Sequence, residues 1–414
     1  MTIPGLGGRI DAGKALETNP VGGSASMRSI RAKHLILLLS GPFVIYAVLG
    51  GLLGRALARD SAYRYLSVFQ DVVTLIMNNY VDPVQMDSVI EGGIRGMMDA
   101  LDTDSAYLSP KEFEEFQRPP EGVAGIGVEV TKRYYLQVVG VLPGSASDKV
   151  GLRPGDLLKS VDGMNTREVS ATIGEALLRG KPGTSINLEV IRGRQPEPIE
   201  LTVERSAGTG DAVSHKMLTD TIGYVCIAAF QAGSSDEVAR AVQSVTQSGA
   251  RQLVVDVRNS FGRMAGHGAQ VAGLFVPGGV AAILQNRKGE KTQLEIDTGR
   301  VVFQGPMTLL INRGTSGAAE ILGSAVKHAQ RAELVGERSA GRGGVQKAIP
   351  LQDGSGLILS VSQYSTPGGE PLLGTGLTPD VEVEQAYEDE GSEGDPTLEK
   401  AIEILSRERA KVAA

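Results

Sequence analysis

The sequence predicts a multidomain chain that places α/β and β domains behind one membrane-spanning helix. Three observations support this prediction. Leu35 to Gly54 forms a run of 20 residues without a charge, the length that a helix needs to cross a bilayer. A glycine-punctuated β unit follows at about 118–205, and strands then alternate with helices over 206–384, as in an α/β domain. A chain of 414 residues is long enough for two or three such domains.

Composition excludes several classes of function. Aromatic residues make up only 4% of the chain and tryptophan is absent, so stacking on bases or sugars is not expected. The net charge of −7 argues against nucleic acid as a partner. The four histidines show no metal-ligand spacing, and we expect neither a metal nor a cofactor. The single cysteine, Cys226, lies in an apolar run, which is typical of a buried strand residue.

The N-terminal region predicts export of most of the chain. Residues 1–33 are rich in glycine and serine and read as a flexible tail, and residues 34–57 as the membrane anchor. Positive residues precede the apolar run, which orients the N-terminus toward the cytoplasm. We therefore expect a single-pass protein of the inner membrane with its bulk periplasmic or otherwise extracytoplasmic. A signal peptide cleaved after Ala56-Leu57-Ala58 is the alternative, and it also exports the chain.

A helical region is predicted at 62–117. Apolar residues from Tyr65 to Ile76 recur at helical spacing, and a second helix is expected from Val89 to Leu101. At the other end of the chain, residues 385–414 are expected to form an acidic linker followed by an amphipathic helix that Pro396 opens.

Residues 118–205 show the order of a PDZ domain. A strand follows Gly125-Ile126-Gly127-Val128, a P-G-S-A turn leads into a short helix, and a helix at Ala171–Arg179 precedes two final strands. This order resembles a PDZ domain, which binds a protein C-terminus as an added strand. The resemblance implies that backbone N–H groups of Gly125, Ile126, Gly127 and Val128 hold the terminal carboxylate of a protein tail.

The stretch from 307 to 346 predicts a strand–helix–strand unit within the domain at 206–384. Met307–Ile311 reads as a buried strand, and a helix is expected to start near Thr315, with Thr315 as its N-cap. A short strand and the glycine turn at 341–344 follow. This arrangement places a helix N-terminus at the carboxyl edge of a sheet, where backbone N–H groups suit an oxyanion.

These segments resemble the carboxyl-terminal processing (tail-specific) serine proteases of peptidase family S41. The resemblance rests on Thr315-Ser316-Gly317-Ala318-Ala319-Glu320, on Ala340-Gly341-Arg342-Gly343 and on the order of the segments around them. It implies a crotonase-like core that uses a serine nucleophile and a lysine base. Here the nucleophile position is Gly317 and the base position is Arg342, while Gln346 matches a polar position of the pattern. Glycine carries no nucleophile, and arginine cannot release its proton to act as a base.

The loop that helps form the oxyanion hole in this family is also altered. Residues 256–263 resemble its D-L-R-N-N-P-G-G segment, with Gly262 at the oxyanion-loop position and Arg263 in place of the second glycine. A displaced catalytic pair, Ser316 with His267, is one way in which activity could persist. A helical step of one residue turns a side chain by about 100°, so we expect Ser316 to face away from the site.

Two classes of function follow from this sequence. One is a proteolytically silent homologue that binds protein C-terminal tails, unfolded exported proteins or a partner protease. The other is a serine endopeptidase with residual or unconventional catalysis. A homo-oligomer is compatible with either class.

Overall fold

The computed structural model describes residues 64–118, 124–193, 195, 197–206, 210–384 and 394–413. The predicted flexible tail and membrane anchor lie outside these residues, as does most of the acidic linker. No helix within the described ranges combines the length and the apolarity that a bilayer crossing requires. The chain divides into two compact units, residues 1–89 and residues 90–414. In the first unit, residues 64–79 form a helix.

The second unit begins in the helical region. Helix α2 (Met86–Asp99) spans the boundary between the units, and strand β1 (Ala106–Leu108) and helix α3 (Pro110–Gln117) follow. A pattern of apolar residues at helical spacing predicted the two helices before residue 101, whereas β1 was not predicted. β1 forms because it pairs with a strand from the other end of the chain, Ala106 lying opposite Ile358.

The α/β domain is built on a six-stranded sheet with the order β17-β14-β13-β10-β9-β8. Its strands are β8 (Val213–Met217), β9 (Ile222–Ile227), β10 (Gln252–Asp256), β13 (Met307–Ile311), β14 (Glu333–Gly336) and β17 (Val381–Glu382). β9, β10, β13, β14 and β17 run parallel, so β10 and β13 end at the same edge. The functional segments predicted from the sequence follow these two strand ends.

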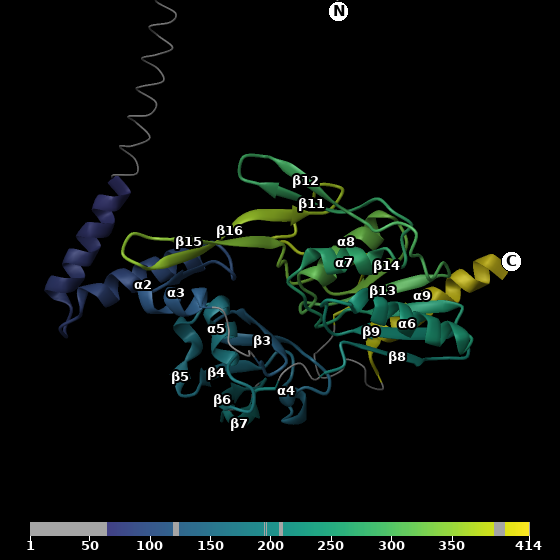
Figure 1. Ribbon diagram of the computed structural model, residues 1–414, viewed down its shortest axis with the longest axis horizontal. Helices are drawn as coiled ribbons and strands as arrows, with labels where there is room; N and C mark the ends of the chain where they lie inside the picture. The colour runs from purple at the N-terminus through teal and green to yellow at the C-terminus, as the bar shows by residue number, and fades with distance from the viewer. Residues whose placement is uncertain are drawn as a thin grey trace, which may run out of the picture. The chain divides into compact units, whose positions relative to one another are not determined.

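Helices cover both faces of this sheet (Figure 1). Helices α6 (Ser234–Gln247), α7 (Ala265–Ala272) and α8 (Ala318–His328) pack on one face, and α9 (Pro396–Ala413) packs on the other. Alternation of side chains along a strand explains the two cores. Leu253 and Val255 of β10 face the three helices, whereas Val254 contacts the core that includes Leu405 of α9.

A second sheet was not predicted from the sequence. It has the order β1-β16-β11-β12, and β15 also pairs with β16. Its remaining strands are β11 (Val280–Asn286), β12 (Lys291–Glu295), β15 (Gly344–Pro350) and β16 (Gly356–Ser365). In Figure 1, β15 and β16 form a long ribbon, and β16 also pairs with β1.

The PDZ-like unit forms a separate sheet with the order β2-β3-β4-β6-β7 and its own apolar core. Its elements are β2 (Val128–Lys132), β3 (Leu136–Val141), α4 (Ala146–Lys149), β4 (Leu157–Val161), β5 (Met164–Asn165), α5 (Ala171–Leu178), β6 (Ser185–Ile191) and β7 (Ile199–Glu204). β2 is the terminal strand of this sheet, and α5 contacts it. An edge strand beside a helix is the arrangement to which PDZ domains add a peptide strand.

Candidate functional site

The site lies where β10 and β13 end and their following loops meet. Asn312 comes directly after β13, and its carboxamide oxygen accepts hydrogen bonds from the backbone N–H groups of Asn259 and Gly314, both at 2.9 Å. Asn312 is 3% exposed. This buried side chain fixes the loop after β13 to the loop after β10, which carries Gly262 and Arg263.

The helix after β13 begins later than predicted. α8 starts at Ala318, with Gly317 at the N-cap position, so Thr315 is not its N-cap. The Thr315 hydroxyl instead donates to the carbonyl oxygen of Val257 at 2.7 Å and accepts from the backbone N–H of Asn312 at 3.0 Å. The threonine is fully buried and serves to join the two loops.

Gly317, at the nucleophile position, has a backbone that only glycine adopts easily. Its φ of 60° and ψ of −115° lie in a region that L-residues rarely occupy. A Cβ atom at this position would lie 2.3 Å from the carbonyl oxygen of Gly262. The same carbonyl oxygen accepts a hydrogen bond from the backbone N–H of Ala318 at 2.8 Å. The first N–H group of the helix is therefore occupied by the protein's own backbone and does not face an open oxyanion hole.

A buried carboxylate joins the helix start to the turn that carries the base position. Glu320 accepts hydrogen bonds from the backbone N–H groups of Gly317, Gly341 and Arg342 and from the hydroxyl of Ser339, at 2.5–3.0 Å. It is fully buried, and this burial raises the pKa of Glu320, although the four donors act in the opposite direction. Glu320 thus sets the position of Arg342 relative to Gly317.

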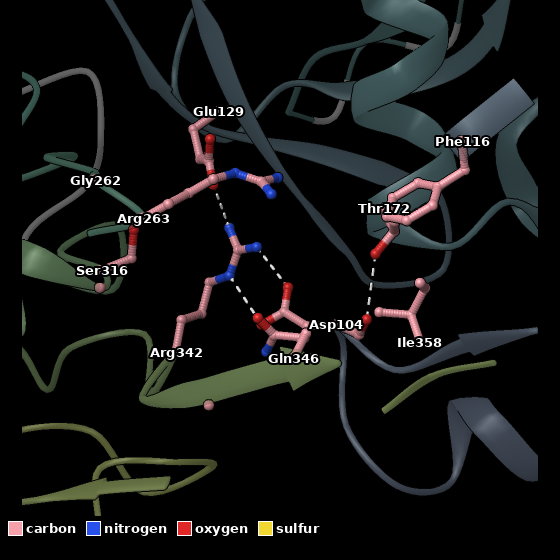
Figure 2. A pocket seen from close by; sticks show the side chains of 12 residues that line it. Asp104, Phe116, Glu129, Thr172, Gly262, Arg263, Ser316, Arg342, Gln346 and Ile358 are labelled. Atoms are coloured by element: carbon pink, nitrogen blue, oxygen red, sulfur yellow. Dashed lines mark hydrogen bonds and ion pairs between the residues drawn. The ribbon is translucent and has the colours of Figure 1, made fainter. Parts of the chain in front are cut away.

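Arg342, at the base position, is bound by carboxylates from two other parts of the chain (Figure 2). Its guanidinium group donates to Asp104 at 2.5 Å and to Glu129 at 2.7 Å, and it lies 3.7 Å from Glu175. The side chain is 12% exposed. Burial alone would lower the pKa of Arg342, but the negative charges of Asp104 and Glu129 raise it above its ordinary value. Arg342 stays protonated and cannot act as a base.

A second arginine, Arg263, reaches the same acidic side chains. It forms an ion pair with Glu175, and 57% of its side chain is exposed. Glu175 is 7% exposed, and its Oε1 atom has no hydrogen-bond donor among the described residues. The site therefore contains three carboxylates, Asp104, Glu129 and Glu175, and three guanidinium groups, those of Arg342, of Arg263 and of Arg179, which lies 3.9 Å from Glu175.

These residues surround a cavity of about 290 Å³. Its lining comes from the helical region, from β2 and α5 of the PDZ-like unit, and from the loops of the α/β domain: Asp104, Phe116, Glu129, Thr172, Gly262, Arg263, Ser316, Gly317, Arg342, Gly344, Gln346 and Ile358. The structure thus brings the predicted positions 262, 317, 342 and 346 together. The amide of Gln346 donates to the hydroxyl of Ser360 at 3.2 Å.

The displaced pair Ser316 and His267 is not assembled. Ser316 lines the cavity, which corrects the expectation that it faces away from the site, but it is only 2% exposed. Its hydroxyl lies 3.4 Å from the carbonyl oxygen of Ser260. His267 does not line the cavity, and its buried Nδ1 has no partner among the described residues. No hydrogen bond joins the two side chains in the described chain.

The loop predicted to bind a peptide carboxylate precedes β2, and backbone hydrogen bonds fix its position. The carbonyl oxygens of Ile126 and Gly127 accept hydrogen bonds from the backbone N–H groups of Ser147 and Leu142. Gly127 has a φ of 83°, and a Cβ atom there would lie 2.3 Å from Cβ of Ser145. The glycine is therefore required for the loop to pack against the α4 segment.

The sequence analysis missed Asp104, Glu129 and Glu175, and it did not anticipate the role of Glu320. No local pattern marks the three acidic residues, because their partner Arg342 is separated from them by up to 238 positions. For Glu320 a signal existed: a glutamate three residues after an N-cap position is typical of a helix start. In the described part of the chain, no group of acidic, histidine and cysteine side chains is arranged to hold a metal ion.

Comparison with known proteins identifies both domains. Residues 221–383 match peptidase family S41, and residues 137–192 match the PDZ domain. A carboxyl-terminal-processing protease of Synechocystis is 28% identical over 345 residues, which cover 80% of this chain and 81% of the relative. The carboxy-terminal processing protease CtpA of Bacillus subtilis is 28% identical over 313 residues, 75% of this chain and 67% of the relative.

A solved structure supports the same assignment. The photosystem II D1 C-terminal processing protease superposes with a TM-score of 0.61 at 26% identity, covering 80% of this chain and 92% of that protein. A PDZ domain followed by a peptidase S41 domain agrees with the resemblance drawn from the sequence. Residues 221–383 of this chain therefore form a peptidase S41 domain, and residues 137–192 form a PDZ domain.

Proposed function

We propose that this chain is a proteolytically silent member of its family that binds protein C-terminal tails. The observation that carries the proposal is the combination of Gly317 and Arg342 at the two chemical positions. The first has no side chain to attack a peptide bond. The second is held protonated by Asp104 and Glu129. In a serine protease, loss of the nucleophile alone lowers turnover by roughly 10⁶-fold.

The geometry of the cavity supports the absence of proteolytic activity independently of Gly317 and Arg342. The carbonyl oxygen of Gly262 accepts the N–H group of Ala318 that would otherwise be free for an oxyanion. An acyl-transfer site needs donors directed at the developing negative charge, and a carbonyl oxygen in that place opposes it. A residual endopeptidase is the second candidate, because Ser316 lines the cavity.

A labelling and cleavage experiment separates these two candidates. The full-length chain in detergent is incubated with unfolded casein and, separately, with a fluorophosphonate probe that acylates reactive serines. We expect no cleavage and no labelling under conditions in which an active serine protease shows both. Cleavage by the wild type that disappears in Ser316→Ala would overturn the proposal, since it would identify a displaced nucleophile.

The binding part of the proposal rests on the PDZ domain. β2 is an edge strand, and the loop Gly125–Val128 precedes it, as tail recognition by strand addition requires. Fluorescent decapeptides with small or apolar last residues should bind the full-length chain when their terminus is a free carboxylate. Amidation should abolish this binding. Equal affinity for free and amidated peptides would refute recognition of the terminus.

We further propose that residues 34–57 anchor the chain in the inner membrane, with the PDZ and protease-like domains on the outer side. The uncharged 20-residue run and the preceding positive residues support this orientation. The full-length protein should fractionate with membranes at its unreduced mass of 43.5 kDa. A soluble product that begins near Arg59 would instead indicate a cleaved signal. A partner protease and a homo-oligomer are further parts of this proposal, to be sought by cross-linking in the envelope.

A further inference from the structure

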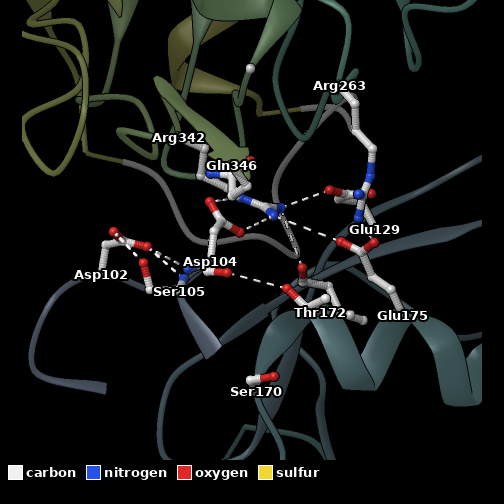
Figure 3. Close-up of polar contacts among 12 residues, drawn as sticks. Asp102, Asp104, Ser105, Glu129, Ser170, Thr172, Glu175, Arg263, Arg342 and Gln346 are labelled. Carbon is white, nitrogen blue, oxygen red and sulfur yellow. Dashed lines mark hydrogen bonds and ion pairs between the residues drawn. The ribbon is translucent and has the colours of Figure 1, made fainter. Parts of the chain in front are cut away.

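Acidic side chains lie on both sides of the groove between β2 and α5, and they indicate which protein tails bind there. This inference rests on the tail-binding function proposed above. Glu129 lies on β2, the strand to which a peptide would add, and Glu175 lies on α5, the helix beside that strand. Figure 3 shows both carboxylates converging on the guanidinium groups of Arg263 and Arg342. We call Glu129 and Glu175, together with Asp104, the acidic subsite.

One carboxylate of the subsite is incompletely satisfied by the protein itself. Glu175 forms ion pairs with Arg263, with Arg342 at 3.7 Å and with Arg179 at 3.9 Å, but its Oε1 atom accepts no hydrogen bond in the described chain. A buried carboxylate oxygen without a donor is costly, and a cation with N–H groups would satisfy it. The adjoining cavity of about 290 Å³ leaves room for a side chain of a bound peptide.

The two arginines are held very differently. Arg342 is 12% exposed and also donates to the backbone carbonyl oxygen of Val130, so it is fixed on three sides. Arg263 is 57% exposed, and within the subsite it is held by its ion pair with Glu175. An ion pair of a largely exposed side chain contributes little free energy and exchanges readily. The position of Arg263 on Glu175 is therefore the one that a ligand can take over.

Strand addition places this position close to the peptide terminus. A tail that adds to β2 runs antiparallel to it, with its carboxylate at the loop Gly125–Val128. Glu129 follows that loop directly, and successive residues of a strand advance by about 3.3 Å. The side chains that meet the acidic subsite thus belong to roughly the last three residues of the tail.

We propose that this PDZ domain selects protein tails that carry a lysine or arginine within their last three residues. The basic side chain binds Glu175 in the place that Arg263 occupies in the free protein. Acidic residues at the same position are rejected because, once Arg263 is displaced, the three carboxylates of the subsite face only Arg342 and Arg179. Arg263 is thus an internal competitor of the ligand and Glu175 is a specificity-determining residue.

Three fluorescent decapeptides test this proposal on the full-length chain in detergent, by anisotropy. They share a free carboxylate and an apolar last residue and differ only in a lysine, glutamine or glutamate at the penultimate position. We expect the lysine tail to bind roughly three- to tenfold more tightly than the glutamine tail, and the glutamate tail to bind most weakly. The difference should shrink as salt is raised from roughly 50 to 500 mM, since screening weakens exposed charge pairs.

Variants expected to weaken the lysine preference and a variant expected to strengthen lysine binding make the test specific for the acidic subsite. Glu175→Gln should remove the preference for lysine while leaving the glutamine tail bound, and Glu129→Gln should reduce the preference if Glu175→Gln does not fold. Arg263→Ala should tighten the lysine tail severalfold, because it frees Glu175. Matched controls are Glu200→Gln at an exposed position of β7 and Arg300→Ala in the α/β domain, and both should leave all three affinities unchanged.

The outcomes distinguish this proposal from the one on which it rests. Equal binding of the three tails, or a lysine preference that survives both glutamate substitutions, would overturn the acidic subsite and leave tail recognition intact. Failure of every tail to bind would overturn tail recognition itself. A weaker lysine tail in Arg263→Ala would show that Arg263 helps the ligand and would refute its role as a competitor.

Discussion

Replacing Gly317 by serine is the most direct way to test how the nucleophile position lost its function. Any L-residue at φ 60° and ψ −115° is strained, which costs about 1–3 kcal/mol. The new Cβ would also stand 2.3 Å from the carbonyl oxygen of Gly262. That oxygen has to move, and its hydrogen bond from Ala318 is then lost, at a further ~0.5–1.5 kcal/mol. We expect Gly317→Ser to lower the free energy of unfolding by about 2–4 kcal/mol.

Urea unfolding followed by circular dichroism measures this change. With a urea m-value of about 3 kcal/mol/M, the midpoint should fall by about 1 M. Gly289→Ser is the matched control, since Gly289 also has a positive φ (83°) but no heavy atom would lie within 4 Å of a Cβ atom there. Strain alone should cost this control about 1–2 kcal/mol. If Gly317→Ser costs no more than Gly289→Ser, the clash with Gly262 does not exist and the reasoning fails.

Three further predictions concern Arg342, Cys226 and Asp395. Arg342→Met should destabilise the chain by about 3–5 kcal/mol, because it leaves buried carboxylates unpaired, whereas Arg300→Met should cost under about 1 kcal/mol; equal midpoints in urea would contradict this. Burial raises the pKa of Cys226 to about 12, so the native thiol should react with a disulfide reagent at pH 8 roughly 10³-fold more slowly than in the unfolded chain. A native rate equal to the unfolded rate would disprove it. Asp395→Ala should abolish hydrogen-exchange protection in α9, because Asp395 pairs with the buried Arg258 and accepts from the N–H group of Leu398; unchanged protection would refute that role.

Local patterns were sufficient to predict the PDZ-like unit and most of the α/β sheet. The strand predicted at 307–311 coincides with β13. In these segments runs of apolar residues, interrupted by glycine turns, carry the information. The start of α8 was misplaced because Thr315 is an ordinary N-cap residue in sequence, while in the structure its hydroxyl is taken by Val257.

The second sheet and the charges around Arg342 could not be predicted in the same way. β1 is only three residues long, and it exists because β16 pairs with it. The meeting of Arg342 with Asp104 and Glu129 depends on how three regions pack, and local patterns in one sequence carry no information on contacts between residues this far apart. The sequence therefore showed that the nucleophile and the base of the site are replaced, but not which side chains surround Arg342.

Pairing between segments that are far apart in the sequence affects how the chain folds as it is synthesised. Ala106 pairs with Ile358, and Arg258 is paired with Asp395, 137 positions further on. A chain that emerges N-terminus first cannot complete the sheet through β1, or cover the buried guanidinium of Arg258, until nearly all of it has been delivered. Contacts of such sequence separation slow folding, and until then the edge of β1 stays unpaired. The newly delivered polypeptide thus depends on protection from aggregation for longer than a domain built from neighbouring segments would.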